Sequence, residues 1–243
     1  MTTATTTAPL LACEGISAGY GKLAVARDID LELGSGQVVA MLGPNGSGKT
    51  TFLLTVAGFL KPLGGSVLVD GVAVKAGSAR RMNKAGVVLV PDSRALFSGL
   101  TTIENLQLAT GSTRDGIDAA LDLFPSLQRR AKVRAGLLSG GEQQMLALAR
   151  AIVQRPRVLL IDELSMGLAP VIVESLLPVV RNVADETGAA VVLVEQHVHL
   201  ALEVADAALV LVHGKVALQG EAAAIRQEAE AIESAYLGMQ SSS

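Results

Sequence analysis

The sequence contains no tryptophan, and aromatic side chains make up only 2% of its 243 residues. Few rings are therefore available to stack on nucleobases. The formal net charge is −3 and the pI is about 5.7, so no basic excess attracts a phosphate backbone. These two deficits disfavour a nucleic-acid-binding protein.

Long apolar runs and cysteines are also scarce. No run of 18 or more apolar residues occurs, so no transmembrane helix is expected. Cys13 is the only cysteine, which excludes a disulfide within the chain and favours a cytosolic location. Half of the residues are nevertheless hydrophobic, which is enough for a sizeable core in one large domain.

The two ends of the chain differ from the rest. Residues 1–10 are mostly Thr and Ala and lack the basic start and apolar middle of a signal peptide. We expect a disordered tail there and a second short tail at 239–243. Residues 11–238 are expected to form a single domain, which closes with two short helices at 221–227 and 229–237.

Short apolar runs alternate with helical patterns, as in parallel βαβ units. Uninterrupted apolar runs are typical of strands that are covered on both faces. Such strands are predicted at 38–42, 86–90, 158–161 and 190–194, with a closing pair at 208–212 and 215–218. A helix is predicted at 50–59, behind the first strand. The sequence therefore indicates an α/β fold.

Two regions depart from this pattern. In the first, apolar and polar residues alternate, as in half-exposed antiparallel strands. These segments are 16–20, 25–33, 66–70 and 72–74. In the second, residues 100–135, helical patterns are broken by Gly111, Gly116 and Pro125, which indicates an inserted helical subdomain.

A glycine-rich sequence follows the strand predicted at 38–42 and opens the next helix. It has the Gly-x4-Gly-Lys-Thr pattern of a phosphate-binding loop. The glycines let backbone N–H groups turn toward phosphates, and the helix N-terminus adds partial positive charge. Lys49 is expected to reach the β- and γ-phosphates, and Thr50 to ligate Mg²⁺. Nucleotide contacts are expected from Gly43, Pro44, Asn45, Gly46, Ser47, Gly48, Lys49, Thr50 and Thr51.

Two acidic residues end the strand predicted at 158–161. Carboxylates at the carboxyl end of such a strand lie where doubly wound sheets bind their ligands. Asp162 is placed to hold Mg²⁺, directly or through water. Glu163 is placed to polarise a water for in-line attack on the γ-phosphorus.

A second turn of small residues is less expected. Leu138-Ser139-Gly140-Gly141-Glu142-Gln143-Gln144 offers free backbone N–H groups suited to an anion, although the chain already has a phosphate loop. Two such turns suggest a nucleotide held from two sides, by two copies of the chain.

The phosphate loop, this Ser-Gly-Gly-Glu-Gln element and Ile161-Asp162-Glu163, in this order, resemble the ATP-binding cassette (ABC) ATPase family over about residues 11–238. The resemblance implies a P-loop NTPase fold. It comprises a RecA-like core, an antiparallel β-subdomain and an α-helical subdomain inserted at about 95–155. It also implies two cassettes that pair head to tail around two ATP molecules. Contacts to the partner's ATP would then come from Ser139, Gly140, Gly141 and Glu142.

Three further segments gain an interpretation from the resemblance. Tyr20 matches the aromatic residue that stacks on adenine, although a tyrosine after a strand is commonly half-buried structure. His197 matches the switch histidine that hydrogen-bonds the γ-phosphate. Residues 166–170 match the loop that signals between the two ATP sites. The other histidines, His199 and His213, match nothing and are expected to be structural.

Two positions depart from the family pattern. Most members carry Gln where this chain has Asp92, at the loop that senses Mg²⁺ and the attacking water. Cassettes of branched-chain amino-acid importers often carry Glu there, and residues 94–106 and 235–238 are similar to that subfamily. Asp is one methylene shorter than Glu, which puts its reach to the metal in question. Leu164 stands where Pro or Ala is commoner.

The resemblance favours the ATPase subunit of an importer for hydrophobic amino acids or similar small solutes. It would act at the cytoplasmic face of the cell membrane, on separate permease subunits, with a solute-binding protein as an indirect partner. The expected permease contacts are Leu96, Phe97 and Leu100, which alternatively are core residues. An exporter cassette and a soluble non-transport cassette are the alternative functions. The sequence leaves the solute, and a homodimer or heterodimer, open.

Overall fold

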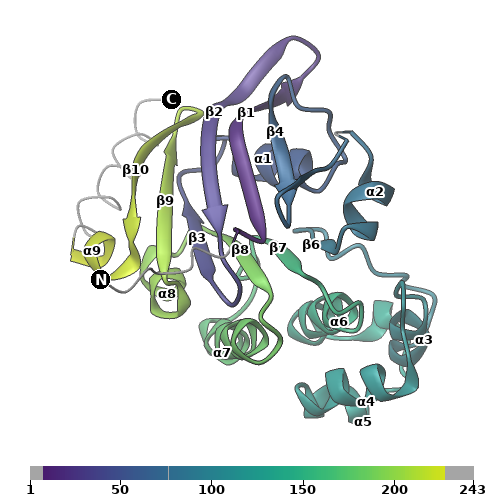
Figure 1. Ribbon diagram of the computed structural model, residues 1–243. Coiled ribbons are helices and arrows are strands. Elements are labelled where there is room, and N and C mark those ends of the chain that lie inside the picture. The colour runs from purple at the N-terminus through teal and green to yellow at the C-terminus, as the bar shows by residue number, and fades with distance from the viewer. Residues whose placement is uncertain (1–7, 76, 228–243) are drawn as a thin grey trace, which may run out of the picture.

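The computed structural model describes residues 8–75 and 77–227, whose strands form two sheets that pack against each other (Figure 1). The expected tail at 239–243, the helix at 229–237, the motif at 235–238 and most of the tail at 1–10 lie outside these residues.

The larger sheet has six strands in the order β10-β9-β3-β8-β7-β6. Its strands are β3 (Val38–Leu42), β6 (Val87–Val90), β7 (Val158–Asp162), β8 (Ala190–Glu195), β9 (Ala207–Val212) and β10 (Lys215–Glu221). All are parallel except β10, which pairs with β9 as the predicted closing pair. All four predicted buried strands form: β3, β7 and β8 are buried at every residue, and β6 is buried except at the half-buried Leu89.

The smaller sheet is antiparallel, in the order β2-β1-β4-β5. Its strands are β1 (Leu11–Tyr20), β2 (Leu23–Leu33), β4 (Gly64–Val69) and β5 (Val72–Ala73). The prediction started β1 at residue 16, five residues late. Gly15 has a left-handed φ of 57°, and the register with β2 shifts between Cys13 and Ile16. This bulge breaks the alternation of apolar and polar residues, which hid the first half of the strand.

Helix α1 (Lys49–Val56) packs between the two sheets. Phe52, Leu53 and Val56 are buried in one cluster with apolar side chains of both sheets. The predicted end at residue 59 is wrong, because Gly58 adopts a left-handed φ of 80° and stops the helix early.

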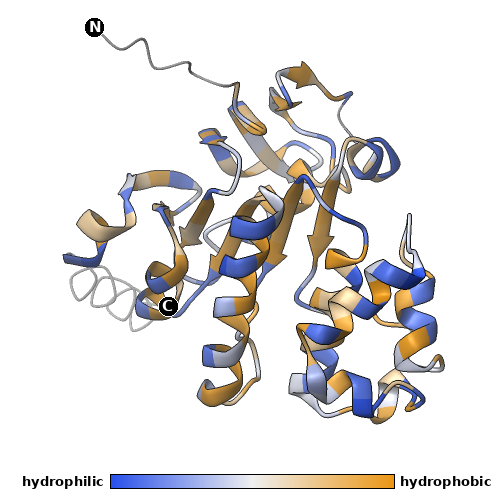
Figure 2. Ribbon diagram, turned by 60° about the horizontal axis from the view of Figure 1, so that its bottom comes forward, coloured by the Kyte–Doolittle hydropathy of each residue, from blue (hydrophilic) through white to orange (hydrophobic). Residues whose placement is uncertain are grey.

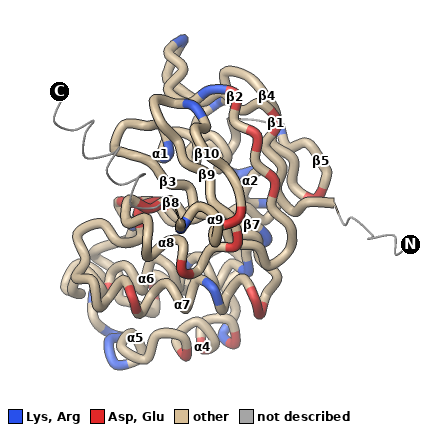
Figure 3. The backbone as a smooth tube through the Cα atoms, turned by 90° about the vertical axis from the view of Figure 1, so that its left-hand side faces the viewer, with Lys and Arg blue, Asp and Glu red and all other residues tan. Residues whose placement is uncertain are grey.

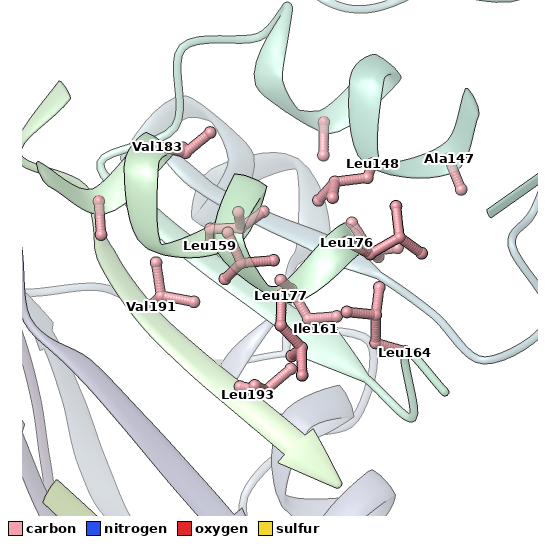
Figure 4. Close-up of a cluster of buried hydrophobic side chains, with 14 of the residues drawn as sticks. Ala147, Leu148, Leu159, Ile161, Leu164, Leu176, Leu177, Val183, Val191 and Leu193 are labelled. Atoms are coloured by element: carbon pink, nitrogen blue, oxygen red, sulfur yellow. The ribbon is translucent and has the colours of Figure 1, made fainter. Parts of the chain in front are cut away.

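The other face of the six-stranded sheet is covered by α6 (Gly140–Ile152), α7 (Pro170–Thr187), α8 (Val198–Val204) and α9 (Ala222–Gln227). Figure 4 shows leucines and valines of α6 and α7 meeting those of β7 and β8. Leu164 is fully buried in this cluster. It therefore anchors the chain directly after Glu163, which accounts for an apolar residue larger than the usual Ala at this position.

A group of short helices stands beside α6, away from the sheets (Figure 1). It comprises α3 (Thr102–Gln107), α4 (Arg114–Asp122), α5 (Pro125–Arg129) and the 3₁₀ turn Ala135–Leu137, while α2 (Ala79–Lys84) precedes β6. Each of α3, α4 and α5 begins at a residue that favours a helix N-terminus. Thr101 caps α3 in a capping box with Glu104, Thr113 caps α4, and Pro125 is the first residue of α5.

Polarity follows this architecture. The parallel strands of the larger sheet are almost uniformly hydrophobic, whereas the helices alternate hydrophobic and hydrophilic residues (Figure 2). Lys and Arg are interspersed with Asp and Glu along the chain (Figure 3). Among the described residues, no helix has both the length and the apolar character needed to cross a membrane.

Candidate functional site

Three neighbouring parallel strands, β3, β8 and β7, end at the same edge of the larger sheet. The phosphate loop follows β3, Asp162 ends β7 with Glu163 next, and Gln196 and His197 follow β8. The carboxyl edge of such a sheet is where α/β proteins bind ligands. The topology thus gathers residues that lie more than a hundred positions apart.

The phosphate loop requires glycine for space as well as for backbone conformation. A Cβ at Gly43 would lie 2.2 Å from the carbonyl oxygen of Leu211 on β9, and its φ is 151°. A Cβ at Gly48, whose φ is 104°, would lie 3.1 Å from the Ala26 Cβ on β2. Strands from both sheets therefore press against the loop and leave room only for backbone.

Lys49 points into its own loop. Its side chain is buried, and Nζ donates hydrogen bonds to the carbonyl oxygens of Gly43 at 2.7 Å and Pro44 at 3.0 Å. Burial lowers the pKa of Lys49, and the nearby carboxylates of Glu163, Asp162 and Glu195 partly oppose that shift. The loop thus holds the Lys49 ammonium group against two of its own backbone carbonyl oxygens.

Asp162 and Thr50 form the contact between the acidic strand and the phosphate loop. The Thr50 hydroxyl donates to Asp162 Oδ1 at 3.2 Å, and Asp162 is 2% exposed. The pKa of Asp162 is raised to about 6, mainly because the carboxyl group is buried. The Thr50 hydrogen bond lowers this pKa in part, and the charges of Asp92 and Glu163 add to the increase. Hydroxyl and carboxylate oxygens are the hard ligands that Mg²⁺ prefers, so this pair fits that ion.

Glu163 is half-buried beside this pair and has a left-handed backbone with φ of 48°. Its N–H donates to the carbonyl oxygen of Val194 on β8 at 3.0 Å. The next residue, Leu164, is buried in the core. The Glu163 carboxyl group is therefore attached to a fixed backbone while remaining accessible to water.

Asp92 is exposed in the loop after β6, and its carboxylate accepts a hydrogen bond from the Ser93 N–H at 2.6 Å. Its charge raises the pKa of Asp162. Two residues later, Arg94 donates to the side-chain oxygens of Gln144 at 2.8 Å and Gln143 at 3.0 Å. The loop is thereby attached to α6.

The second small-residue turn forms the N-terminus of α6. Ser139 and Glu142 make a reciprocal capping box, in which the Ser139 hydroxyl accepts from the Glu142 N–H and the Glu142 carboxylate accepts from the Ser139 N–H. These Ser139 bonds and Arg130 lower the pKa of Glu142. A Cβ at Gly141 would lie 3.1 Å from the Ile172 side chain, so α7 packs closely against the turn.

Tyr20 ends β1 and is 54% exposed. It borders an open hollow of about 510 Å³ that residues 60–63 also line. The adjoining strand β2 reaches the phosphate loop, since Val25 and Ala26 are the neighbours of Gly48. The tyrosine ring is thus free to take a flat ligand.

The three histidines have different settings. His197 is exposed at the N-terminal cap of α8, and the preceding Gln196 is exposed as well. His213 occupies the two-residue turn between β9 and β10, where it and Gly214 both have positive φ. His213 is therefore a turn residue. His199 is exposed on α8.

Sequence reasoning missed Arg94 and the buried pair formed by Glu195 and Ser165. The Ser165 hydroxyl and N–H both donate to the Glu195 carboxyl group. A signal existed for Glu195, because it ends a buried apolar strand just as Asp162 does. Arg94 opens the subfamily-like stretch 94–106, but no local pattern reveals its partners, which lie about fifty residues away.

These features define a class: a nucleotide-binding α/β protein with a phosphate loop on a central strand and an acidic pair on a neighbouring one. Comparison with known proteins refines it. The sequence model of the ABC transporter family matches residues 26–165. BraG of Pseudomonas aeruginosa, a high-affinity branched-chain amino acid transport ATP-binding protein, is 37% identical over 94% of this chain and 100% of BraG.

Further relatives agree. LivF of Archaeoglobus fulgidus, a probable branched-chain amino acid transport ATP-binding protein, is 38% identical over 85% of this chain and 90% of LivF. A solved ATP-binding subunit of an ABC transporter is 26% identical, with a TM-score of 0.79 over 92% of this chain and 94% of that one. The dimeric bacterial ABC transporter cassette MJ0796 is 24% identical, with a TM-score of 0.78 over 87% of this chain and 98% of the MJ0796 chain. The chain belongs to the ABC transporter family and is its ATP-binding, ATP-hydrolysing subunit.

Proposed function

We propose that the chain hydrolyses ATP to drive an importer of branched-chain or similar hydrophobic amino acids. The observation that carries this proposal is the near full-length similarity to BraG and LivF, whose names specify that solute class. The Asp92 loop, which differs from that of most ABC cassettes, supports the same subfamily.

Different site residues contact the phosphates, the adenine ring and the metal ion of ATP. Residues 43–51, with Lys49 at their centre, hold the phosphates, while the exposed Tyr20 ring stacks on adenine. Thr50 and Asp162 would hold Mg²⁺, with Asp92 as a further candidate ligand from the loop after β6. That ion would neutralise charge on the β- and γ-phosphates.

Hydrolysis requires a base and a residue that senses the γ-phosphate. Glu163 takes the proton from the attacking water, because its half-buried carboxyl group is held by a fixed backbone beside Asp162. His197, exposed after β8 at the same edge of the sheet, donates a hydrogen bond to the γ-phosphate.

The turn at Ser139, Gly140 and Gly141 serves a second cassette. The Ser139 hydroxyl and the Glu142 carboxylate bond each other in the cap, so the backbone N–H groups of Gly140 and Gly141 at the N-terminus of α6 remain to contact ATP held by a partner. The dimeric assembly of a cassette with the same fold supports this arrangement. The partner is a second copy or a related ATPase subunit.

The exposed end of the 92–100 loop would dock on permease subunits at the cytoplasmic face of the membrane. Phe97 is 53% exposed, and its ring lies 5.7 Å from the guanidinium carbon of Arg150. The buried Asn105 side chain bonds both the N–H and the carbonyl oxygen of Phe97. Phe97 is thus presented outward on a rigid support, with Leu96 and Leu100 half-buried around it.

An uptake experiment tests the proposal. Cells that produce this protein are compared with cells from which its gene has been deleted, using radiolabelled leucine, isoleucine and valine, with glucose as the control solute. We expect deletion to abolish saturable branched-chain uptake and the parent gene, but not a Glu163→Gln variant, to restore it. Unchanged amino-acid uptake together with altered export of a lipid or drug would identify an exporter instead.

A further inference from the structure

A buried acidic residue outside the assigned site ends strand β8. Glu195 is 1% exposed, and its two carboxyl oxygens accept hydrogen bonds from Ser165, from the N–H at 2.9 Å and from the hydroxyl at 2.5 Å. Burial raises the pKa of Glu195, and the Ser165 bonds oppose that shift. Burying a carboxyl group this deeply destabilises the fold unless hydrogen bonds replace its contacts with water. Ser165 donates two such hydrogen bonds.

Ser165 belongs to the same tight turn as Glu163. At the first position of the turn, the Glu163 N–H donates to the carbonyl oxygen of Val194, the neighbour of Glu195. At the second, the Leu164 side chain is fully buried between β7 and α7 (Figure 4). At the third, Ser165 is held by Glu195. Each residue of the turn therefore has its own attachment, and two of the three lead to the end of β8.

The turn needs these attachments because its first residue is in an unfavourable conformation. Glu163 has a φ of 48°, a left-handed backbone that side-chain-bearing residues adopt at an energetic cost. Such a conformation persists only where the surroundings fix it. If the Ser165 attachment were lost, the turn could relax and move the Glu163 carboxyl group from its place beside Asp162.

We propose that Glu195 is a positioning residue that holds the turn Glu163–Ser165 on the end of β8 and so fixes the Glu163 carboxyl group for attack on ATP. The inference rests on the proposed role of Glu163. Glu195 would influence the rate of hydrolysis through its hydrogen bonds to Ser165. This differs from a purely electrostatic influence, in which the charge of Glu195 would act on the nearby Lys49.

Steady-state ATP hydrolysis by the purified full-length chain tests the proposal. Glu195→Ala should lower kcat by about tenfold or more with little change in the KM for ATP, since misplacement affects the attack rather than binding. Glu195→Gln should restore most of kcat, because its amide oxygen accepts from the Ser165 N–H and its NH₂ group donates to the Ser165 hydroxyl. Ser165→Ala removes one bond and should fall between them. The double variant should be no worse than Glu195→Ala alone.

Two further measurements separate positioning from stability. Amide hydrogen exchange of Ser165 should accelerate in Glu195→Ala and stay slow in Glu195→Gln. Val192→Ala, a buried change on the opposite face of the same strand, should lower Tm while leaving kcat within about twofold.

Parental kcat in Glu195→Ala would overturn the proposal, as would a Glu195→Gln variant as slow as Glu195→Ala. An equal loss of kcat in Val192→Ala would reduce Glu195 to a structural role. Glu163→Gln, assayed in parallel, separates the two hypotheses. If it hydrolyses ATP at the parental rate, the role of Glu163 is wrong; if it is inactive while Glu195→Ala is normal, only the positioning role is wrong.

Discussion

The Thr50 hydroxyl donates a hydrogen bond to Asp162 Oδ1 at 3.2 Å, although the two residues are 112 positions apart. This contact joins the first turn of α1 to the end of β7. It places a hydroxyl and a carboxylate oxygen together at the phosphate loop, where both can reach a single divalent cation.

Replacing Thr50 with Val removes that hydroxyl at nearly constant volume. We expect Mg²⁺-dependent ATP hydrolysis to fall by about tenfold or more, because a ligand and a hydrogen bond to a charged group are lost. Thr50→Ser keeps the hydroxyl and should retain most activity. Titration of the rate with Mg²⁺ measures the effect, and equal activity of the two variants would exclude Thr50 as a ligand.

The raised pKa of Asp162 predicts a pH-dependent stability in metal-free buffer. Above about pH 6 the folded protein carries a buried, ionised Asp162, which destabilises it. As the pH falls from 6 towards 4, the folded state takes up a proton that the unfolded state does not, and this destabilisation is relieved. Asp162→Asn should therefore raise Tm at pH 8 and lose most of that advantage near pH 4.5. A constant difference between the two proteins across this range would contradict the assignment.

Replacing Glu163 with Gln should separate ATP binding from hydrolysis. The amide keeps the shape of the side chain but cannot accept the proton of the attacking water, so kcat should fall by about 100-fold or more. ATP binding should persist and trap a dimer, which size-exclusion chromatography with ATP would detect. Hydrolysis at the parental rate would show that another group is the base.

Ser139→Arg should prevent that ATP-driven dimer when it is introduced into the Glu163→Gln background. The large cation would occupy the surface that contacts the partner, and the capping box would be lost at a cost of about 1 kcal/mol. Thr101→Arg is a matched control, because it breaks the other capping box, at α3. We expect Thr101→Arg to dimerise with ATP. Dimerisation of the Ser139 variant would refute the contact in trans.

Two adjacent exposed side chains follow β8, and their variants identify the residue that senses the γ-phosphate. His197→Ala should lower kcat by about tenfold or more, because a hydrogen bond to the reacting group is lost. Gln196→Ala should remain close to the parent. ATPase assays at saturating ATP measure both, and the reverse result would assign the role to Gln196.

Most of the fold was predictable because it depends on local patterns. The apolar runs of β3, β7 and β8 and the Gly-Lys-Thr sequence locate the sheet and its phosphate loop without reference to the rest of the chain. The errors occurred where one residue changes the pattern, as Gly15 does within β1 and Gly58 does after α1.

The missed site residues have a different cause. Glu195 and Ser165, like Arg94 and its glutamines, act through partners that only the tertiary structure brings near. No spacing along the sequence encodes such contacts. Leu164, by contrast, departs from the family pattern in the sequence itself, and its burial among Ile161, Leu176 and Leu177 supplies the reason (Figure 4).

The position of β3 between β8 and β9 also has a consequence for synthesis of the protein. Both neighbours of this strand belong to the last quarter of the described chain, whereas β1, β2 and β4 pair among themselves. On the ribosome, the small sheet can assemble early, but β3 has no strand to pair with until β8 has emerged at residue 195, and its second neighbour follows only at residue 212. A nascent or prematurely terminated chain that ends before β8 would therefore carry the complete phosphate-loop sequence without the strands that flank β3, and we expect ATP binding only after β8 and β9 have been made.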